Sequence, residues 1–372
     1  MPDKPYIIGI TGNIASGKSV VSQYLQNLGA LTIDADVLAQ RVISVGAPGF
    51  DPVVNAFGNG ILDSQGQIDR RLLADIVFSD QGKLKLLEQV IHPFVLAAID
   101  RIMSSTKSPV VVVEAIKLFE TGFHRHCDAV WTVAAEDEVR LQRLIHERNL
   151  SPVTAQLRLS SQPPQERKIA LSDHVIRTDG SFSDTLQQVM RAYASLVQTV
   201  HQQKVKFSLS EEVVLAKLAL PDAFQITGFF NRKNKAPSDQ EDLCKLLAKN
   251  SFWGVFDGDD LCKLISCKQR IGVALINEFH FLDDPSGIYD SLMPDIIHTL
   301  QLYMRQNYVE IFILKPGILC PEDVFALNGV HLKINDFEYA YRSVLLQDQK
   351  LNDEMISFRL ILSDEYNNLF KM

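Results

Sequence analysis

At 372 residues the chain exceeds the usual size of a single hydrophobic core, so we expect two domains. Its hydrophobic content of 46%, charged content of 22% and lack of a long apolar stretch exclude a membrane-spanning protein. The net charge of −8 argues against nucleic-acid binding, and five cysteines without a CxxC pair argue against a disulfide framework. We therefore expect a cytoplasmic protein that binds neither nucleic acid nor membrane.

The first predicted element is a buried strand, Tyr6 to Ile10, which leads directly into the sequence GNIASGKS. This segment matches the phosphate-binding pattern G-x-x-x-x-G-K-[ST], whose glycines let successive N–H groups face one anion. Lys18 can reach the β- and γ-phosphates, and the Ser19 hydroxyl can ligate Mg²⁺. Helical spacing follows, so the loop lies at a helix N-terminus, which makes a chance glycine turn the weaker alternative. The predicted nucleotide-binding residues are Asn13, Ile14, Ala15, Ser16, Gly17, Lys18 and Ser19.

A second short strand, Ala30 to Ile33, ends in Asp34-Ala35-Asp36. Carboxylates at the carboxyl end of a parallel strand lie beside the crevice in which open α/β sheets bind ligands. One carboxylate could accept the proton of an attacking hydroxyl, and the other could orient it or hold metal-bound water. Either could instead cap the helix expected near Val37, although only one is needed for that.

Two helices are predicted next, over Ile68 to Phe78 and Leu84 to Met103. Pro93 removes one helical hydrogen bond, so we expect a bend or a new helix start there. His92, just before it, is either an ordinary helix residue or a substrate contact.

The strongest strand is Pro109 to Val113, a β-branched run that is expected to be buried on both faces. It ends at Glu114, which could hold Mg²⁺ through water. A strand over 128–133, a helix over 136–148 and a strand over 173–176 follow, and this alternation predicts a parallel sheet. The arginines of the 136–148 helix either close over the bound nucleotide or form a solvated face with i,i+4 ion pairs. These arginines are Arg140, Arg143 and Arg148.

At these motifs a family resemblance can be stated: residues 6 to about 200 resemble the dephospho-coenzyme A kinases, which are P-loop kinases. The P-loop alone is shared by many families, but the remaining motifs and their order are specific. The motifs are TGNIASGKS, Ile33-Asp34-Ala35-Asp36, Asp69-Arg70-Arg71-Leu72-Leu73, Val77-Phe78, Glu88-x-x-Ile91-His92-Pro93, Leu118-Phe119-Glu120, Arg143-Leu144, Gln162-Pro163 and Ser172-Asp173-His174-Val175-Ile176.

The resemblance implies an α/β kinase domain over residues 1–202 with a parallel five-stranded sheet flanked by helices. A helical insert (about 60–105) would hold dephospho-coenzyme A, and a lid (about 138–168) would close over ATP. The γ-phosphoryl group would pass to the ribose 3′-hydroxyl in the last step of coenzyme A synthesis, with Mg²⁺ as cofactor. By position in the motif, Asp36 resembles the general base and Asp34 its partner. The predicted catalytic residues are Asp36, Lys18, Asp34 and Arg143, and the predicted substrate contacts are His92, Asp36, Glu114 and Lys117.

The chain departs from the family pattern at three places. Where the family has D-x-P-L-L-F-E, this chain has EAIKLFE, so Lys117 introduces a cation. The family turn N-D-G begins with Thr178, and Arg148 follows the first lid arginine by five residues rather than four, which puts its role in doubt.

Residues 203–372 are predicted to form an α+β domain. We expect a helix over Glu211 to Leu218, then strands, and the turn at 257–260 predicts a hairpin. The pattern resembles the GNAT acetyltransferase layout, but the loop 282–287 carries aspartates that would repel a pyrophosphate. We therefore favour a non-catalytic domain that stabilises or dimerises the kinase, whose partner the sequence does not identify. The remaining predicted elements are strands over 251–256, 263–266 and 272–279, a helix over 293–305, a strand over 309–315 and a helix from Glu322.

An alternative function is another small-molecule kinase, or a P-loop NTPase switch with the C-terminal part as its effector. A guanine-nucleotide switch would need a base-reading N-K-x-D motif, and Asn234-Lys235-Ala236-Pro237 lacks the aspartate.

Overall fold

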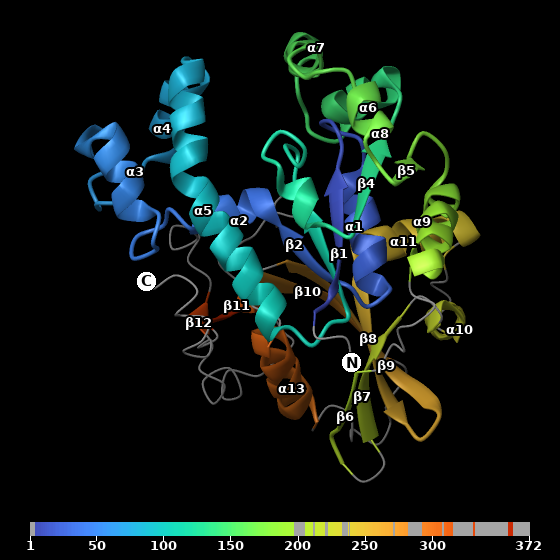
Figure 1. Ribbon diagram of the computed structural model, residues 1–372. Helices are drawn as coiled ribbons and strands as arrows, with labels where there is room; N and C mark the ends of the chain where they lie inside the picture. Colours follow the sequence, from blue (N-terminus) through green and yellow to red (C-terminus); the bar gives the residue numbers. More distant parts are fainter. Residues whose placement is uncertain are drawn as a thin grey trace.

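The computed structural model contains two β-sheets with helices between and around them (Figure 1). It describes residues 4–196, 205–210, 213–219, 222–232, 237, 239–270, 272–281, 292–306, 309–314, 330–331 and 356–359.

The first sheet is parallel and five-stranded, in the order β2-β3-β1-β4-β5, as predicted. Strand β3, between β2 and β1, shows why the valine run is buried on both faces: alternate valines contribute to two different hydrophobic clusters, one on each side. The strands are β1 (Tyr6–Thr11), β2 (Leu31–Asp34), β3 (Val110–Glu114), β4 (Ala129–Ala134) and β5 (His174–Arg177).

Helices cover both faces of this sheet, and two groups of them extend beyond its upper end in Figure 1. Helices α1 and α9 pack on one face, and α2 to α5 pack on the other. No new helix starts at Pro93, because α5 continues through it; Pro93 is exposed, so water can bond the carbonyl whose donor is missing. The helices are α1 (Lys18–Asn27), α2 (Ala35–Arg41), α3 (Phe50–Phe57), α4 (Arg70–Phe78), α5 (Gln81–Ser105), α6 (Asp137–His146), α7 (Pro152–Ser160), α8 (Glu166–Ala170) and α9 (Phe182–Leu196), with short 3₁₀ turns η1 (Asn59–Ile61) and η2 (Phe123–His126).

The second sheet is eight-stranded, in the order β12-β13-β11-β10-β9-β8-β7-β6. All its described pairs are antiparallel except β10 with β11. The predicted hairpin is confirmed, since β8 and β9 pair across Asp257 and Asp260. The strands and helices of this part are β6 (Lys206–Ser208), β7 (Val213–Leu218), α10 (Ala223–Arg232), α11 (Gln240–Lys249), β8 (Ser251–Asp257), β9 (Asp260–Arg270), β10 (Gly272–Phe281), α13 (Met293–Gln306), β11 (Val309–Leu314), β12 (Val330–His331) and β13 (Ile356–Arg359).

The prediction of a helix over 211–218 is wrong, because residues 213–218 form strand β7. Their side chains alternate between the two faces of the second sheet: Leu215 packs with α13 on one side and Leu218 packs with α1 and α10 on the other. Pairing with β8 along its whole length therefore overrides the helical preference of the local sequence. The predicted helix from Glu322, the loop 282–287 and the domain boundary near 203 lie outside the described residues.

The two sheets share one hydrophobic cluster rather than touching at an exposed boundary. It combines Val21 and Leu25 of α1 with Leu247 of α11 and Phe252 of β8, all of them buried. Helix α1, which follows the phosphate-binding loop, is thus packed between the first sheet and the C-terminal part of the chain.

Candidate functional site

The loop between β1 and α1 has backbone geometry that demands its glycines. A Cβ on Gly12 would lie 2.3 Å from the backbone oxygen of Val133, closer than any real contact. Gly17 has a φ of 88°, and a Cβ there would meet the Thr178 hydroxyl at 3.0 Å. Ala15 also has a positive φ, of 58°, which is costly for a residue with a side chain. These conformations fold the loop tightly at the start of α1, where N–H groups and the helix dipole favour an anion.

Lys18 is buried at the start of α1, and its ammonium group turns back over the loop. Its Nζ donates hydrogen bonds to the carbonyl oxygens of Gly12 (3.0 Å) and Asn13 (3.3 Å). Burial lowers the pKa of Lys18, while the nearby carboxylates of Glu114 and Asp36 act in the opposite direction. The site thus brings together the predicted lysine and two of the predicted carboxylates.

The two aspartates of the DAD motif have different surroundings. Asp34 caps helix α2: its carboxylate accepts hydrogen bonds from the N–H groups of Asp36 and Val37, both at 3.0 Å. The Asp36 carboxyl is reachable by water, yet protein crowds around it, and this loss of hydration raises its pKa. Lys18 and Lys117 partly counter that rise. Asp34 therefore fixes the backbone that carries Asp36, and Asp36 stands next to the lysines.

Glu114 ends β3 beside Asp34, with which it is paired in register across β2 and β3. Its carboxylate accepts a hydrogen bond of 2.7 Å from the Ser22 hydroxyl on α1. This bond joins the helix of the phosphate-binding loop to the neighbouring strand end.

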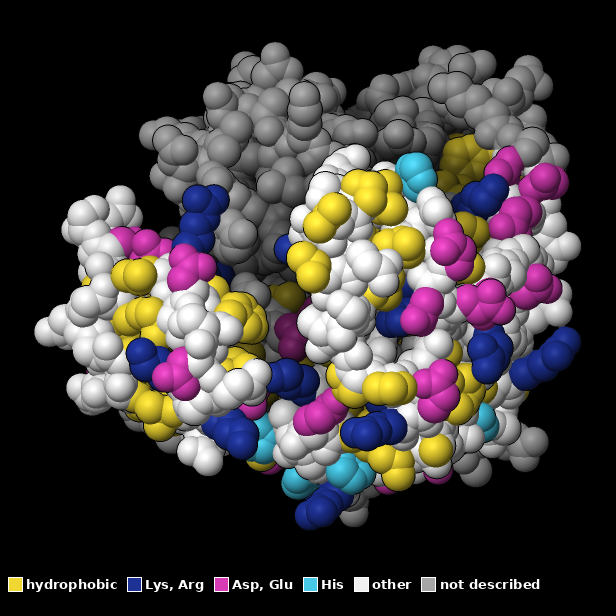
Figure 2. Space-filling view, turned by 90° about the horizontal axis from the view of Figure 1, so that it is seen from above, with side chains coloured by type: hydrophobic (Ala, Val, Ile, Leu, Met, Phe, Trp, Pro, Cys, Tyr) yellow, Lys and Arg dark blue, Asp and Glu magenta, His cyan; other side chains and the backbone are white. Residues whose placement is uncertain are grey.

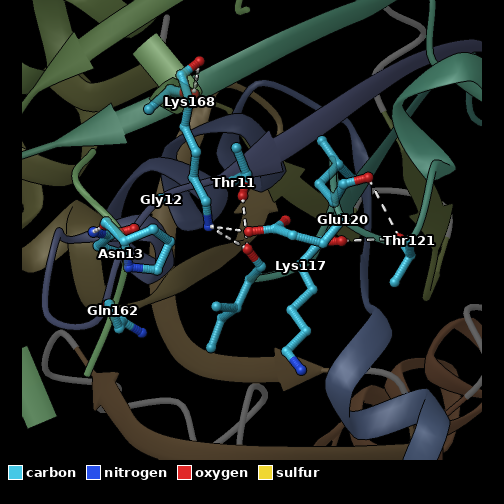
Figure 3. Close-up of polar contacts among 12 residues, drawn as sticks. Thr11, Gly12, Asn13, Lys117, Glu120, Thr121, Gln162 and Lys168 are labelled. Carbon is cyan, nitrogen blue, oxygen red and sulfur yellow. Dashed lines mark hydrogen bonds and ion pairs between the residues drawn. The ribbon is translucent and has the colours of Figure 1, made fainter. Parts of the chain in front are cut away.

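The backbone that follows β3 accepts a hydrogen bond from a buried lysine, Lys168, which the sequence did not single out. Lys168 of α8 donates to the backbone oxygen of Ile116 at 2.6 Å, and the Thr11 hydroxyl donates to the same oxygen at 3.1 Å. Figure 3 shows these two side chains converging on that oxygen. Burial lowers the pKa of Lys168, and Glu120, 3.6 Å away, acts against this. Nothing in the local sequence around Lys168 distinguishes it from a surface lysine. Only its contacts with Ile116 and Glu120, which are distant in sequence, do so.

Lys117, the cation that departs from the family pattern, points away from Lys168 (Figure 3). Its Nζ lies 2.5 Å from the Glu88 carboxylate on α5, and both side chains are partly exposed. His92 is one helical turn beyond Glu88 and therefore on the same side of α5. Helix α5 thus presents Glu88 and His92 on one face, and Lys117 joins that face to the end of β3.

The segment α6–α8 contacts the phosphate-binding loop directly. Arg143 donates to the backbone oxygen of Ala15 at 3.1 Å and to the hydroxyl and backbone oxygens of Thr178 at 3.0 and 2.5 Å. Gln162 accepts a hydrogen bond from the N–H of Ile14 at 2.7 Å, and the Asn13 side chain donates to the backbone oxygen of Pro163 at 2.9 Å. The Gln162-Pro163 motif therefore lies against the loop.

The other two predicted arginines, Arg140 in α6 and Arg148 just after it, have different surroundings. Arg140 is buried and pairs with Asp137 of the same helix at 2.6 Å. Arg148 is close enough to Lys18 to contribute to the lowering of its pKa. Arg148 is thus near the site although its spacing departs from the family pattern.

A hollow separates the two groups of helices above the sheet. Figure 2 shows it between α3–α5 on one side and α6–α8 on the other, with charged side chains along its walls. Ser19 is exposed at the second position of α1. Within the described residues, no group of three or more His, Cys, Asp or Glu side chains could hold a metal by itself. The exposed Ser19 hydroxyl fits an ion such as Mg²⁺, which keeps several waters and is bound by one or two protein groups together with substrate phosphates.

Among the described helices, none has the length and apolarity needed to cross a bilayer.

Comparisons with known proteins agree on the first half of the chain. The family model for dephospho-CoA kinase matches residues 6–184. The dephospho-CoA kinase of Aquifex aeolicus is 40% identical over 190 residues, which are 51% of this chain and 96% of that protein. The solved dephospho-CoA kinase from Campylobacter jejuni is 27% identical, with a TM-score of 0.40 over 51% of this chain and 96% of that one.

A likeness for the other half is much weaker. An acetyltransferase of the GNAT family from Staphylococcus aureus is 12% identical, with a TM-score of 0.29 over 40% of this chain and 99% of that one. Neither TM-score reaches 0.5, so the GNAT-like layout stays a prediction. The family of the first half is instead shown by the sequence match to the Aquifex protein. Through that half, the chain belongs to the dephospho-CoA kinase family.

Proposed function

We propose that the protein transfers the γ-phosphoryl group of ATP to the ribose 3′-hydroxyl of dephospho-coenzyme A. The observation that carries the proposal is the grouping of Lys18, Asp36 and Glu114 at the phosphate-binding loop of a chain that belongs to this family. We further propose that residues 1–202 form the kinase domain, with the insert (60–105) and lid (138–168), and that residues 203–372 form a second domain. A cytoplasmic location and the lack of a nucleic-acid partner stay predictions.

In the proposed reaction, the ribose oxygen attacks the γ-phosphorus, the bond to the β–γ bridging oxygen breaks, and ADP leaves. Asp36 accepts the hydroxyl proton, and its raised pKa brings it closer to the working pH of a general base. Asp34 is its partner in positioning, because its carboxylate caps α2 and accepts a hydrogen bond from the Asp36 N–H. Glu114, Lys117 and His92 are the further proposed substrate contacts.

The nucleotide would occupy the loop formed by residues 13–19. Lys18 exchanges its bonds to loop carbonyls for the β- and γ-phosphates and stabilises the charge of the transferring group. A guanidinium has five N–H donors, so Arg143 can keep its contacts with Ala15 and Thr178 while it donates to phosphate. The Ser19 hydroxyl would hold Mg²⁺, which supplies charge neutralisation on the β- and γ-oxygens when bound.

A coupled assay of ADP release tests the proposal, with ATP and Mg²⁺ in the presence and absence of dephospho-coenzyme A. We expect release to depend on the acceptor. Lys18→Ala should lower kcat by more than about tenfold with unchanged circular dichroism, since losing such a contact costs a few kcal/mol. Lys107→Ala, which changes an exposed lysine away from the loop, is the control.

Release of ADP that ignores the acceptor would instead favour the alternative of an NTPase switch. Full activity of Lys18→Ala would contradict the assignment of the loop. Phosphorylation of other small alcohols in preference to dephospho-coenzyme A would point to a different small-molecule kinase.

A further inference from the structure

The C-terminal part of the chain reaches the nucleotide end of the first domain through one carboxylate. Glu241, in the first turn of α11, accepts hydrogen bonds from the backbone N–H groups of Phe182 (2.8 Å) and Ser183 (3.0 Å). These two residues begin α9, and both lie within the part of the chain that the kinase family model matches. The contact therefore joins residues about 60 positions apart across the two halves.

Glu241 completes the set of acceptors that the start of α9 needs. The first four N–H groups of a helix have no partner inside it. At α9, Ser181 and Asp184 form a reciprocal capping box: the Ser181 hydroxyl accepts from the Asp184 N–H at 3.0 Å, and the Asp184 carboxylate accepts from the Ser181 N–H at 3.2 Å. The two remaining N–H groups, of Phe182 and Ser183, donate to the Glu241 carboxylate. Its negative charge also suits the positive end of the helix dipole.

The start of α9 is linked to the phosphate-binding loop by the turn that precedes it. Thr178 donates from its hydroxyl to the backbone oxygen of Ser16 at 2.7 Å, and its methyl and hydroxyl groups lie against Gly17. Arg143 also bonds both oxygens of Thr178. Ser181 follows Thr178 by three positions, so a shift of the α9 terminus is transmitted to the loop and to Arg143.

We propose that Glu241 is a positioning residue for the bound nucleotide: it fixes the start of α9 and thereby holds the Thr178 turn against the phosphate-binding loop. Through Glu241, the C-terminal half then supports the kinase's nucleotide site. This inference rests on the proposed function insofar as the nucleotide is ATP.

The test uses the full chain with Glu241→Ala, Glu241→Gln and the control Asp242→Asn. Asp242 is the next residue of α11, and its carboxylate pairs with Lys245 on the same helix. Calorimetric titration with ATP and Mg²⁺, without acceptor, should show affinity reduced about tenfold in Glu241→Ala, within the usual range of coupling between linked sites. Glu241→Gln keeps one acceptor oxygen and should fall between Glu241→Ala and the wild type, while Asp242→Asn should match the wild type.

Steady-state kinetics supply the second readout. KM for ATP should rise in Glu241→Ala while KM for dephospho-coenzyme A stays the same, a split that general destabilisation would not produce. Equal ATP affinity in the wild type and Glu241→Gln, or an equal rise in both KM values, would overturn the proposal. If the wild type shows no acceptor-dependent turnover, the proposed function fails, and the titration still decides the role of Glu241. If Glu241→Ala does not fold, the comparison of Glu241→Gln with Asp242→Asn decides it.

Discussion

Replacing Asn27 with alanine should destabilise both halves of the protein together. Asn27 is in the last turn of α1 and 3% exposed. Its amide nitrogen donates to the backbone oxygens of Leu247 (2.8 Å) and Asn250 (3.0 Å), which lie at the end of α11. Its amide oxygen accepts from the Ser251 hydroxyl at 2.8 Å. A single side chain thus donates to two carbonyls at the end of α11.

The expected loss follows from these contacts. The Leu247 carbonyl left without this donor accounts for about 1–3 kcal/mol, and the lost hydrogen bond to Asn250 adds about 0.5–1.5 kcal/mol. The Ser251 hydroxyl keeps a second partner, the Gln23 amide at 3.1 Å, so its share is small. We expect the free energy of unfolding to fall by about 3 kcal/mol, a large part of the 5–15 kcal/mol typical of a folded domain.

Urea unfolding followed by tryptophan fluorescence can measure this loss in each half separately. The chain has two tryptophans, and both are fully buried: Trp131 lies in β4 of the first sheet and Trp253 in β8 of the second. Variants that retain only one of them, with phenylalanine at the other position, report one sheet each. Because α1 and α11 share a core, both reporters should shift to lower urea by the same free energy in Asn27→Ala.

The control is Asn59→Ala, which alters an exposed asparagine and should change stability by less than about 0.5 kcal/mol. A loss below about 1 kcal/mol in Asn27→Ala would refute the weight given to the hydrogen bonds of Asn27 with Leu247 and Asn250. A shift seen by one tryptophan alone would refute the view that the interface couples the two halves.

Three further predictions concern the site itself. Gly12→Ala should abolish measurable ATP binding in a calorimetric titration, because its Cβ would lie 2.3 Å from a backbone oxygen that cannot move freely; wild-type affinity would contradict the loop geometry. Asp36 must be deprotonated to accept a proton, and burial raises its pKa, so kcat should fall on acidification at a higher pH than an ordinary carboxylate gives. The pH profile should lose this limb in Asp36→Asn and keep it in Asp34→Asn, since asparagine also caps a helix; the reverse order would exchange the two roles. Lys117→Met should change the free energy of unfolding by less than about 1 kcal/mol, because its ion pair with Glu88 is partly exposed, yet should raise KM for dephospho-coenzyme A; an unchanged KM would remove Lys117 from the substrate site.

The C-terminal half has a physical connection to the kinase half whatever else it does. Buried polar contacts join α1 to α11 and β8, and the Tyr24 hydroxyl of α1 donates to the backbone oxygen of Cys244 at 3.0 Å. Burial of this hydroxyl raises its pKa. The expectation that this half supports the kinase therefore has a structural basis in α1, whose first residue is Lys18.

The sequence by itself determined those features whose physical cause is local. The phosphate-binding loop could be identified because its glycines, lysine and serine must occupy fixed positions within eight residues. The valine run of β3 indicated a strand buried on both faces, since neighbouring side chains of a strand point in opposite directions. The choice between a base and a helix cap for the two aspartates was open in the sequence, and the backbone of α2 gives the cap to Asp34.

Only the tertiary structure decided the features that depend on distant partners. Strand β7 has a sequence compatible with a helix and becomes a strand because β8 and β6 pair with it. Lys168 and Glu241 resemble ordinary surface residues in the sequence, and they gain their importance from Ile116 and from the start of α9, 52 and 59 positions away. No local pattern encodes such contacts, because a side chain's hydration, charge balance and hydrogen-bond partners are set by whatever the completed fold places around it.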